Sequence, residues 1–212
     1  MAPPPLPPPT LGVILAGGLA RRMGGGDKPL KTLVGVSLLD RVIARLAPQC
    51  AGLVLNANGD PARFAATGLA VVPDGVPGHP GPLAGVLAGL DWARAHAPDI
   101  AWVATAAADS PFLPKNLVAR LHAARAAAGA PLAHAESGGR GHPVAALWPV
   151  ALADDLRRAL VEEGEHRVGR FAARHGAART AWPAEPVDPF LNANAPEDLA
   201  EAERLIARHG EP

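Results

Sequence analysis

The sequence has almost no cysteine, no net charge and no long hydrophobic run. Cys50 is the only cysteine among 212 residues, which excludes an intramolecular disulfide framework and a metal site built from several cysteines. The 20 Lys and Arg residues balance the 20 Asp and Glu residues, so no global positive field exists to hold a nucleic-acid backbone. No apolar run approaches the roughly 20 residues that span a bilayer. We therefore expect neither a general nucleic-acid binder nor a membrane protein.

The N-terminus lacks the features of an export signal. Its first ten residues hold six prolines but neither a basic segment nor an apolar one. Such a composition favours an extended polyproline II conformation, and we expect residues 1–10 to form a disordered, proline-rich tail. The missing signal predicts a cytoplasmic location, which a single cysteine also fits.

From Leu11 onward, short apolar runs alternate with segments of helical periodicity. The expected strands are 11–15, 53–55, 70–72, 100–106, 132–135, 144–148 and 180–182. The expected helices are 37–47, 61–66, 82–96, 115–128, 152–161, 168–175 and 196–209. A repeated β-α order is typical of a parallel sheet covered on both faces. We expect an α/β fold with one doubly wound, mostly parallel sheet in a single domain over residues 11–212.

The loop after the first expected strand is rich in glycine and positive charge. Residues 15–28 contain five glycines, two arginines and one lysine. Glycines let backbone N–H groups approach a phosphate chain, and the cations complement its charge. The loop matches neither the Walker A motif nor the dinucleotide fingerprint G-x-G-x-x-G. Its composition and its place directly after a buried strand favour a triphosphate site over a plain surface loop.

Polar residues follow the other three expected parallel strands as well. Asp109 comes directly after the fourth strand, where a carboxylate can hold Mg²⁺ whose shell is completed by phosphates and water. Taken alone, Asp109 could equally cap the turn before Pro111. Asn56 and Asp74 follow the second and third strands. Because ligands bind at the carboxyl ends of strands in open parallel sheets, these groups together predict a nucleotide and metal site.

Several segments, in order, resemble the molybdenum cofactor guanylyltransferases, the MobA family. They are Leu-Ala-Gly-Gly at 15–18, Arg-Met-Gly-Gly-Gly-Asp-Lys at 22–28, Asn-Ala-Asn at 56–58, Gly-Pro-Leu-Ala-Gly at 81–85, Asp-Ser-Pro-Phe-Leu-Pro at 109–114, Gly-His-Pro-Val at 141–144 and Asp-Pro-Phe-Leu-Asn-Ala-Asn at 188–194. The first loop alone indicates only a sugar-nucleotide-type nucleotidyltransferase. The C-terminal Asn-x-Asn segment makes the resemblance specific, and it runs from about Leu11 to Ile206.

The resemblance implies a Rossmann-like nucleotidyltransferase that uses Mg²⁺. It would transfer GMP from GTP to molybdenum-molybdopterin, release pyrophosphate and form molybdopterin guanine dinucleotide. The implied roles are backbone contacts to the nucleotide from Leu15, Ala16 and Gly17, phosphate contact by Lys28, base and ribose contacts by Asn56 and Asp74, Mg²⁺ and GTP contact by Asp109, and pterin contact by Asn192 and Asn194. The resemblance also implies transient contact with other cofactor-biosynthesis proteins and with the reductases that receive the product.

The chemistry of this transfer agrees with the residues present. A terminal phosphate of molybdopterin would attack the α-phosphorus of GTP in line, so no side-chain nucleophile is needed. Since two anions must be brought together, neutralising their charge is the main catalytic demand. Arg22 and Lys28, with Mg²⁺ on Asp109, can meet that demand, and we name these three as the catalytic residues.

Other functions stay open at this point. The chain could be a related cytidylyl- or sugar-phosphate nucleotidyltransferase, or a non-catalytic molybdopterin carrier, whereas the missing fingerprint argues against a nicotinamide-dependent oxidoreductase. Relatives that use CTP usually carry Ala-Ala-Gly where this chain has Ala16-Gly17-Gly18, which favours guanine. Lys28 and Asp109 argue against a carrier.

The sequence departs from the family pattern in two places. Ala107-Ala108 precedes Asp109 where the family usually has Pro-Cys, which puts the geometry of that strand end in question. Ala195 stands where the family often has Thr before the last helix, and this predicts the loss of a helix N-cap of about 1 kcal/mol.

Overall fold

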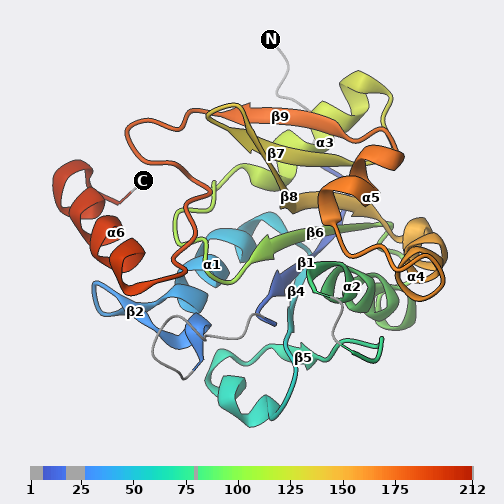
Figure 1. Ribbon diagram of the computed structural model, residues 1–212, viewed down its shortest axis with the longest axis horizontal. Coiled ribbons are helices and arrows are strands. Elements are labelled where there is room, and N and C mark those ends of the chain that lie inside the picture. Colours follow the sequence, from blue (N-terminus) through green and yellow to red (C-terminus); the bar gives the residue numbers. More distant parts are fainter. Residues whose placement is uncertain (1–6, 18–26, 79–80, 212) are drawn as a thin grey trace.

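The computed structural model describes residues 7–17, 27–78 and 81–211, and its centre is a seven-stranded sheet (Figure 1). The strand order is β5-β4-β1-β6-β8-β7-β9. These strands are β1 (Thr10–Leu15), β4 (Gly52–Asn56), β5 (Ala70–Val72), β6 (Trp102–Ala107), β7 (Ala133–Ser137), β8 (Arg140–Pro149) and β9 (Ala178–Trp182). A separate antiparallel pair joins β2 (Thr32–Leu33) to β3 (Val36–Ser37), which was not anticipated.

The helices agree closely with the sequence periodicity. They are α1 (Leu38–Leu46), α2 (Pro82–His96), α3 (Leu117–Ala128), α4 (Ala153–Val161), α5 (Val168–Arg174) and α6 (Pro196–His209). Short 3₁₀ turns lie at Lys28–Leu30, Ala47–Gln49, Pro61–Thr67 and Val150–Leu152, so the expected helix at 61–66 is a 3₁₀ helix. None of the helices in the described ranges is long and apolar enough to cross a membrane.

The sheet is parallel where the sequence alternates strands and helices, and it changes direction afterwards. β5, β4, β1 and β6 all run parallel, whereas β8 is antiparallel to both β6 and β7. The reversal is made by a tight hairpin whose turn residues, Gly138 and Gly139, have φ of 53° and 75°. Positive φ at both central positions is the geometry that glycine adopts without strain. The expected doubly wound, mostly parallel sheet is confirmed.

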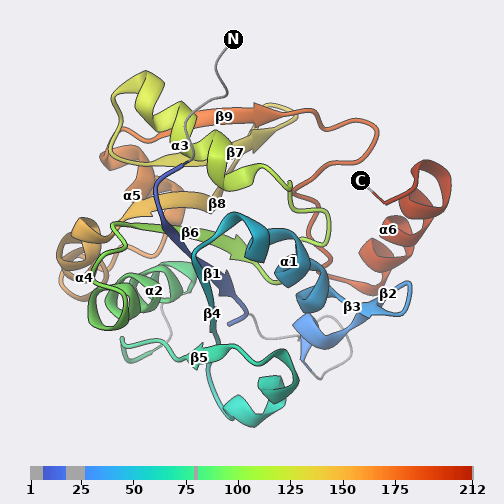
Figure 2. The ribbon, with the colours of Figure 1, turned by 180° about the vertical axis from the view of Figure 1, so that it is seen from behind.

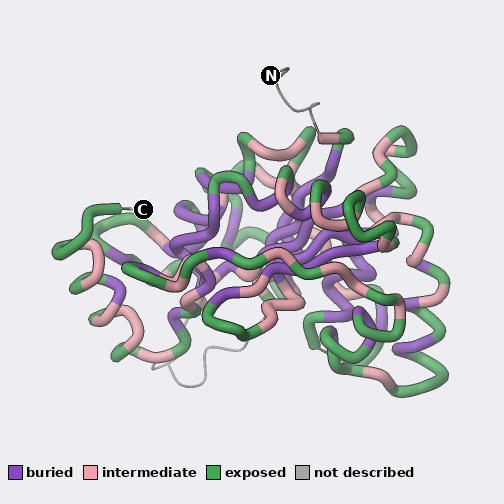
Figure 3. Tube along the Cα trace, turned by 90° about the horizontal axis from the view of Figure 1, so that it is seen from above, coloured by how far each residue is buried: buried purple, intermediate pink, exposed green. Residues whose placement is uncertain are grey.

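Helices cover both faces of the sheet, as Figures 1 and 2 show from opposite sides. On one face α1 and α3 pack on the sheet through residues that include Leu39, Val42 and Leu121. On the other face α2, α4 and α5 enclose a second apolar cluster. Seen from above, the buried residues gather along the middle of the molecule (Figure 3).

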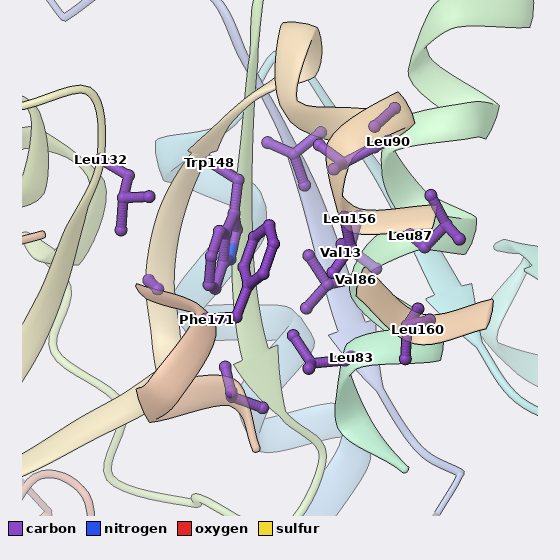
Figure 4. Close-up of a cluster of buried hydrophobic side chains, with 14 of the residues drawn as sticks. Val13, Leu83, Val86, Leu87, Leu90, Leu132, Trp148, Leu156, Leu160 and Phe171 are labelled. Atoms are coloured by element: carbon purple, nitrogen blue, oxygen red, sulfur yellow. The ribbon is translucent and has the colours of Figure 1, made fainter. Parts of the chain in front are cut away.

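The cluster under α2 and α4 is centred on Trp148 of β8. Its indole lies near the ring of Phe171 from α5, with ring centroids 6.3 Å apart, and Val13, Val86 and Leu156 lie close by (Figure 4). The Trp148 Nε1–H donates to the Thr105 hydroxyl at 3.0 Å, which satisfies its buried polar atom. This packing fixes the distance between β1 and α2.

Two further predictions concern the N-terminal tail and the start of the last helix. Thr10 belongs to β1, so the strand begins one residue before the predicted boundary, while residues 1–6 lie outside the described residues and the disorder of the tail stays a prediction. At the other end Ala195 offers no side-chain cap to α6, as expected. The Asp198 carboxylate instead accepts from the backbone N–H groups of Asn194 and Ala195, at 2.7 and 2.8 Å, and supports the start of that helix.

Gly89→Ala is expected to destabilise the fold by about 1 kcal/mol. A methyl group there would lie 2.6 Å from Cγ2 of Val13, a fully buried side chain with no room to move. Overpacking costs about 1–3 kcal/mol, which outweighs the gain of about 1 kcal/mol in helix propensity. Urea unfolding monitored by circular dichroism measures the difference.

Gly169→Ala in α5 is the matched control for this prediction. Its methyl group would lie 3.6 Å from Pro143 Cγ, an ordinary contact, so only the gain in helix propensity remains. We expect this variant to be slightly more stable than the parent. Equal effects of the two substitutions would contradict the packing of α2 on β1 described above.

Candidate functional site

The register of the parallel strands brings four strand ends to one edge of the sheet. Leu15 pairs with Asn56 of β4 and with Ala107 of β6, and Asn56 pairs with Val72 of β5. Beyond the ladder, Ala16 N–H donates to Asn56 O at 2.8 Å. These pairings place the loops that begin at Ala16, Asn56, Asp74 and Asp109 beside each other, as the sequence predicts.

The ends of β4 and β5 form a closed polar cluster around Asp74. The Asn56 amide group donates to Asp74 Oδ1 at 2.9 Å and to Val72 O at 3.1 Å. The Asn58 amide donates to Asp74 Oδ2 at 2.7 Å, while its Oδ1 accepts from Asp74 N at 2.9 Å. Asn56 is almost fully buried, so these bonds fix the orientation of its side chain.

This orientation turns the Asn56 carbonyl oxygen toward α2 and the first loop. A Cβ added at Gly85 would lie 2.2 Å from Asn56 Oδ1 and 2.9 Å from Leu15 Cδ2. A Cβ added at Gly17 would lie 4.0 Å from the same oxygen. The absence of a side chain at Gly85 therefore lets α2 approach the ends of β1 and β4 closely.

Lys28 joins residues that are far apart in the sequence. Its ammonium group forms an ion pair with Asp109 Oδ2 and donates to Asn194 Oδ1 at 2.5 Å. The side chains of Lys28 and Asp109 are only 12% and 17% exposed. A partly desolvated cation is thus held between the end of β6 and the segment before α6, where its charge is weakly screened.

The segment from β9 to α6 crosses the end of β6 (Figure 1). Ser110 Oγ donates to Asn192 Oδ1 at 2.6 Å, and Ala193 N–H donates to Asp109 O at 3.0 Å. With the Lys28 contact, these bonds hold Asn192 and Asn194 against the strand end that carries Asp109.

A further cation lies at the edge of this site. The Arg63 guanidinium group forms an ion pair with Asp27 and donates to Asn58 O at 2.6 Å. It therefore links the end of the glycine-rich loop to the Asp74 cluster. Arg22, which the sequence places in that loop, lies outside the described residues.

Comparisons with known proteins agree with this geometry. Residues 12–179 match the MobA-like NTP transferase domain family. A molybdenum cofactor guanylyltransferase of Nitrobacter hamburgensis is 60% identical over 203 residues, 96% of this chain and 97% of the relative. One from Bradyrhizobium sp. is 63% identical over 196 residues, 92% of each. The chain belongs to the molybdenum cofactor guanylyltransferase family.

Structural comparison shows the same fold. The crystal structure of molybdopterin-guanine dinucleotide biosynthesis protein A from Archaeoglobus fulgidus superposes with a TM-score of 0.69 at 23% identity, covering 93% of this chain and 99% of that one. The expectations of a nucleotidyltransferase, and of a Rossmann-like fold for it, are confirmed. The family membership excludes the alternative of a nicotinamide-dependent oxidoreductase.

Guanylyltransferases of this family are nucleotidyltransferases, a class that typically uses a divalent metal. The Asp109 carboxylate fits such an ion, because its Oδ1 is buried and has no hydrogen-bond partner among the described residues. Within residues 7–17, 27–78 and 81–211, no group of three or more His, Cys, Asp or Glu side chains could hold a metal by itself. A single carboxylate suits an ion whose other ligands are phosphates and water.

The structure groups the residues predicted from the sequence into two halves around Lys28 and Asp109. Leu15, Ala16, Gly17, Asn56 and Asp74 lie on the side of β4 and β5, and Asn192 and Asn194 lie on the other side. The Ala107-Ala108 departure leaves the strand end intact, since Ala108 N–H donates to Leu15 O at 3.0 Å.

Sequence reasoning gave no role to several residues that shape this guanylyltransferase site. Gly85 and Ser110 lie inside quoted motifs, so their positions could have suggested a role. Asn58 likewise lies in the Asn-Ala-Asn motif at 56–58 without an assigned role. Arg63 lies in a 3₁₀ turn without any motif, and its link to Asp27 depends on tertiary structure alone.

Proposed function

We propose that this chain transfers GMP from GTP to molybdenum-molybdopterin with Mg²⁺, releases pyrophosphate and forms molybdopterin guanine dinucleotide. The observation that carries the proposal is the position of Lys28 between Asp109 and Asn194. This one cation contacts Asp109, which would hold the metal and contact the nucleotide, and it also contacts Asn194, in the segment that would face the acceptor.

GTP would bind across the four strand ends. Its triphosphate would lie on the backbone of Leu15, Ala16 and Gly17, within reach of Lys28, where the strand ends at a glycine-rich loop. The base and ribose would lie toward Asn56 and Asp74, whose side chains are fixed by their mutual hydrogen bond of 2.9 Å. A side chain that is already held in place can bind one ligand in preference to another without paying the cost of becoming ordered on binding.

The acceptor would lie on the other side of Asp109, along Asn192 and Asn194. Both asparagines are exposed, so their amide groups are accessible to a polar heterocycle such as a pterin. Their attachment to Ser110 and Lys28 keeps the acceptor next to the phosphate-binding half. Such proximity converts the meeting of two anions into an oriented, intramolecular step.

The protein's own task in this reaction is to offset negative charge. Lys28, with Arg22 from the same loop, would neutralise the phosphates of both substrates, and no side-chain nucleophile is required. Mg²⁺ held by Asp109 would supply further positive charge at the α-phosphate. Lys28 forms an ion pair with Asp109, so the cation that would face the phosphates lies directly beside the carboxylate that would hold the metal.

Pyrophosphate release with Mg²⁺ and molybdopterin, compared for GTP, CTP, ATP and UTP, tests this proposal. Release with GTP alone, dependent on the pterin, is the expected result. Release with CTP would assign the chain to the cytidylyl-transferring relatives. Pterin binding without turnover of any nucleotide would indicate a non-catalytic molybdopterin carrier.

The cytoplasmic location and contacts with biosynthetic partners and recipient reductases stay predictions.

Asp109→Asn is expected to lower the rate of GMP transfer on the order of a hundredfold or more. The substitution removes the charge that would hold Mg²⁺ and pair with Lys28, and loss of one such electrostatic group costs about 3–4 kcal/mol of transition-state stabilisation. Steady-state kinetics at saturating Mg²⁺ measures the loss. Asp99→Asn, at an exposed position, is the matched control. Near-normal turnover of Asp109→Asn would remove this carboxylate from the site.

Gly85→Ala is expected to weaken GTP binding about tenfold while the chain stays folded. The added methyl group would displace the Asn56 amide from Asp74, because it would lie 2.2 Å from Asn56 Oδ1. A cost of about 1.4 kcal/mol corresponds to one factor of ten in affinity. Calorimetric titration with GTP measures it, with Gly169→Ala as the control. Unchanged affinity in a folded Gly85→Ala variant would show that the nucleotide does not depend on Asn56.

A further inference from the structure

We propose that Ser137 and His142 are positioning residues for the acceptor half of the site. They would act through a directed chain of hydrogen bonds, from His142 through Ser137 to Asp188, that fixes the turn leading to Asn192 and Asn194. This inference rests on the proposed acceptor role of those two asparagines.

Ser137 lies at the end of β7 and is only 2% exposed. Its hydroxyl oxygen is 2.8 Å from Asp188 Oδ1 and 2.7 Å from His142 Nε2. The same Asp188 oxygen accepts from the backbone N–H of Phe190 at 2.9 Å, and Leu191 N–H donates to Asp188 O at 3.2 Å. A β-strand end is therefore bonded directly to the turn at 188–191.

The number of hydrogens on each group determines which group donates in these hydrogen bonds. A hydroxyl group has one hydrogen, and a carboxylate only accepts, so Ser137 must donate to Asp188. His142 must then donate its Nε2–H to the Ser137 oxygen. Burial lowers the pKa of His142 below its ordinary value, which favours the neutral ring. A neutral ring with its hydrogen on Nε2 keeps Nδ1 as an acceptor.

This arrangement is not a nucleophilic triad, although it contains serine, histidine and aspartate. In such a triad the imidazole lies between the carboxylate and the hydroxyl and accepts the hydroxyl proton. Here the hydroxyl lies between the other two groups and gives its hydrogen to the carboxylate. Ser137, His142 and Asp188 therefore position the turn and do not form a nucleophile.

His142 holds the same turn by a second contact. Its ring stacks on Phe190 with centroids 4.7 Å apart and planes inclined by 24°. Phe190 is 4% exposed and meets the edge of Trp182 at 5.4 Å. His142 thus fixes the turn both through Ser137 and through the ring of Phe190.

The far side of this turn is the acceptor segment itself. Asn192, Ala193 and Asn194 are bonded to Ser110, Asp109 and Lys28, as described above. The segment is anchored at one end by the His142-Ser137-Asp188 chain and at the other by the end of β6. Releasing the first anchor would loosen both asparagines, whereas the hydrogen bonds of Asn56 and Asn58 to Asp74 in the nucleotide half lie outside this network.

Ser137→Ala tests the proposal. We expect the KM for molybdopterin to rise about tenfold, while kcat and the KM for GTP stay within about twofold of the parent, because only ground-state positioning of the acceptor is lost. Hydrogen exchange of the Phe190 amide should become faster. Nitrogen NMR of His142 should show the hydrogen on Nε2 in the parent and a mixture of tautomers in the variant.

Two substitutions of His142 keep the test independent of how well Ser137→Ala folds. His142→Gln retains a donor near the Nε2 position but loses the ring on Phe190, so its KM for molybdopterin is expected to rise less than that of His142→Phe. His142→Phe retains the ring on Phe190 but has no donor, so its KM should rise as in Ser137→Ala. Thr67→Ala, which removes a hydroxyl bonded to Phe64 O outside this network, is the control.

A hydrogen on Nδ1 of His142 in the parent, or His142→Phe with the KM of the parent, would overturn the proposal. Failure of the proposed function would look different, because the parent itself would then transfer no GMP to molybdopterin. The tautomer and the exchange of the Phe190 amide report on the hydrogen-bond chain in that case too.

Discussion

Parallel pairing of β1 with β4 on one side and β6 on the other is the constraint on which this site depends. Backbone hydrogen bonds fix the register of the three strands. Their last residues, Leu15, Asn56 and Ala107, therefore lie side by side at the same edge of the sheet. Every loop that carries a candidate residue of the nucleotide half begins at that level. A slip of one residue in either pairing would turn the polar side chains of one loop away from the others.

Above this edge, the electrostatics are governed by a small number of partly buried charges. The Lys28 ammonium is held by Asp109 and Asn194, and the Arg63 guanidinium by Asp27 and the backbone of Asn58. Each cation links the glycine-rich loop or its end to a different part of the sheet edge. The Lys28 ammonium, in a shielded position, is suited to polyphosphate chemistry because it needs little reorganisation when the anions arrive.

The acceptor half is built by a different means. β8 runs antiparallel to its neighbours β6 and β7, and the chain returns through β9 to cross the end of β6 before it reaches α6. The turn at 188–191 is bonded to Ser137 of β7, and the next residues are bonded to the end of β6. The part of the sheet that contains β7 and β8 therefore supports the segment that carries Asn192 and Asn194.

The sequence by itself determined the order of the strands of the main sheet and of the helices that cover its two faces, because these depend on periodicity in contiguous segments. From contiguous motifs it also predicted the residues of the nucleotide loop. It also named Lys28, Asp109, Asn192 and Asn194, although their roles came from resemblance. Only the tertiary structure decided that Lys28 bridges Asp109 and Asn194, that Gly85 admits Asn56, and that Ser137 is bonded to Asp188. Such contacts join residues up to 166 positions apart, and no local pattern encodes which distant side chains the packing of a sheet will bring together.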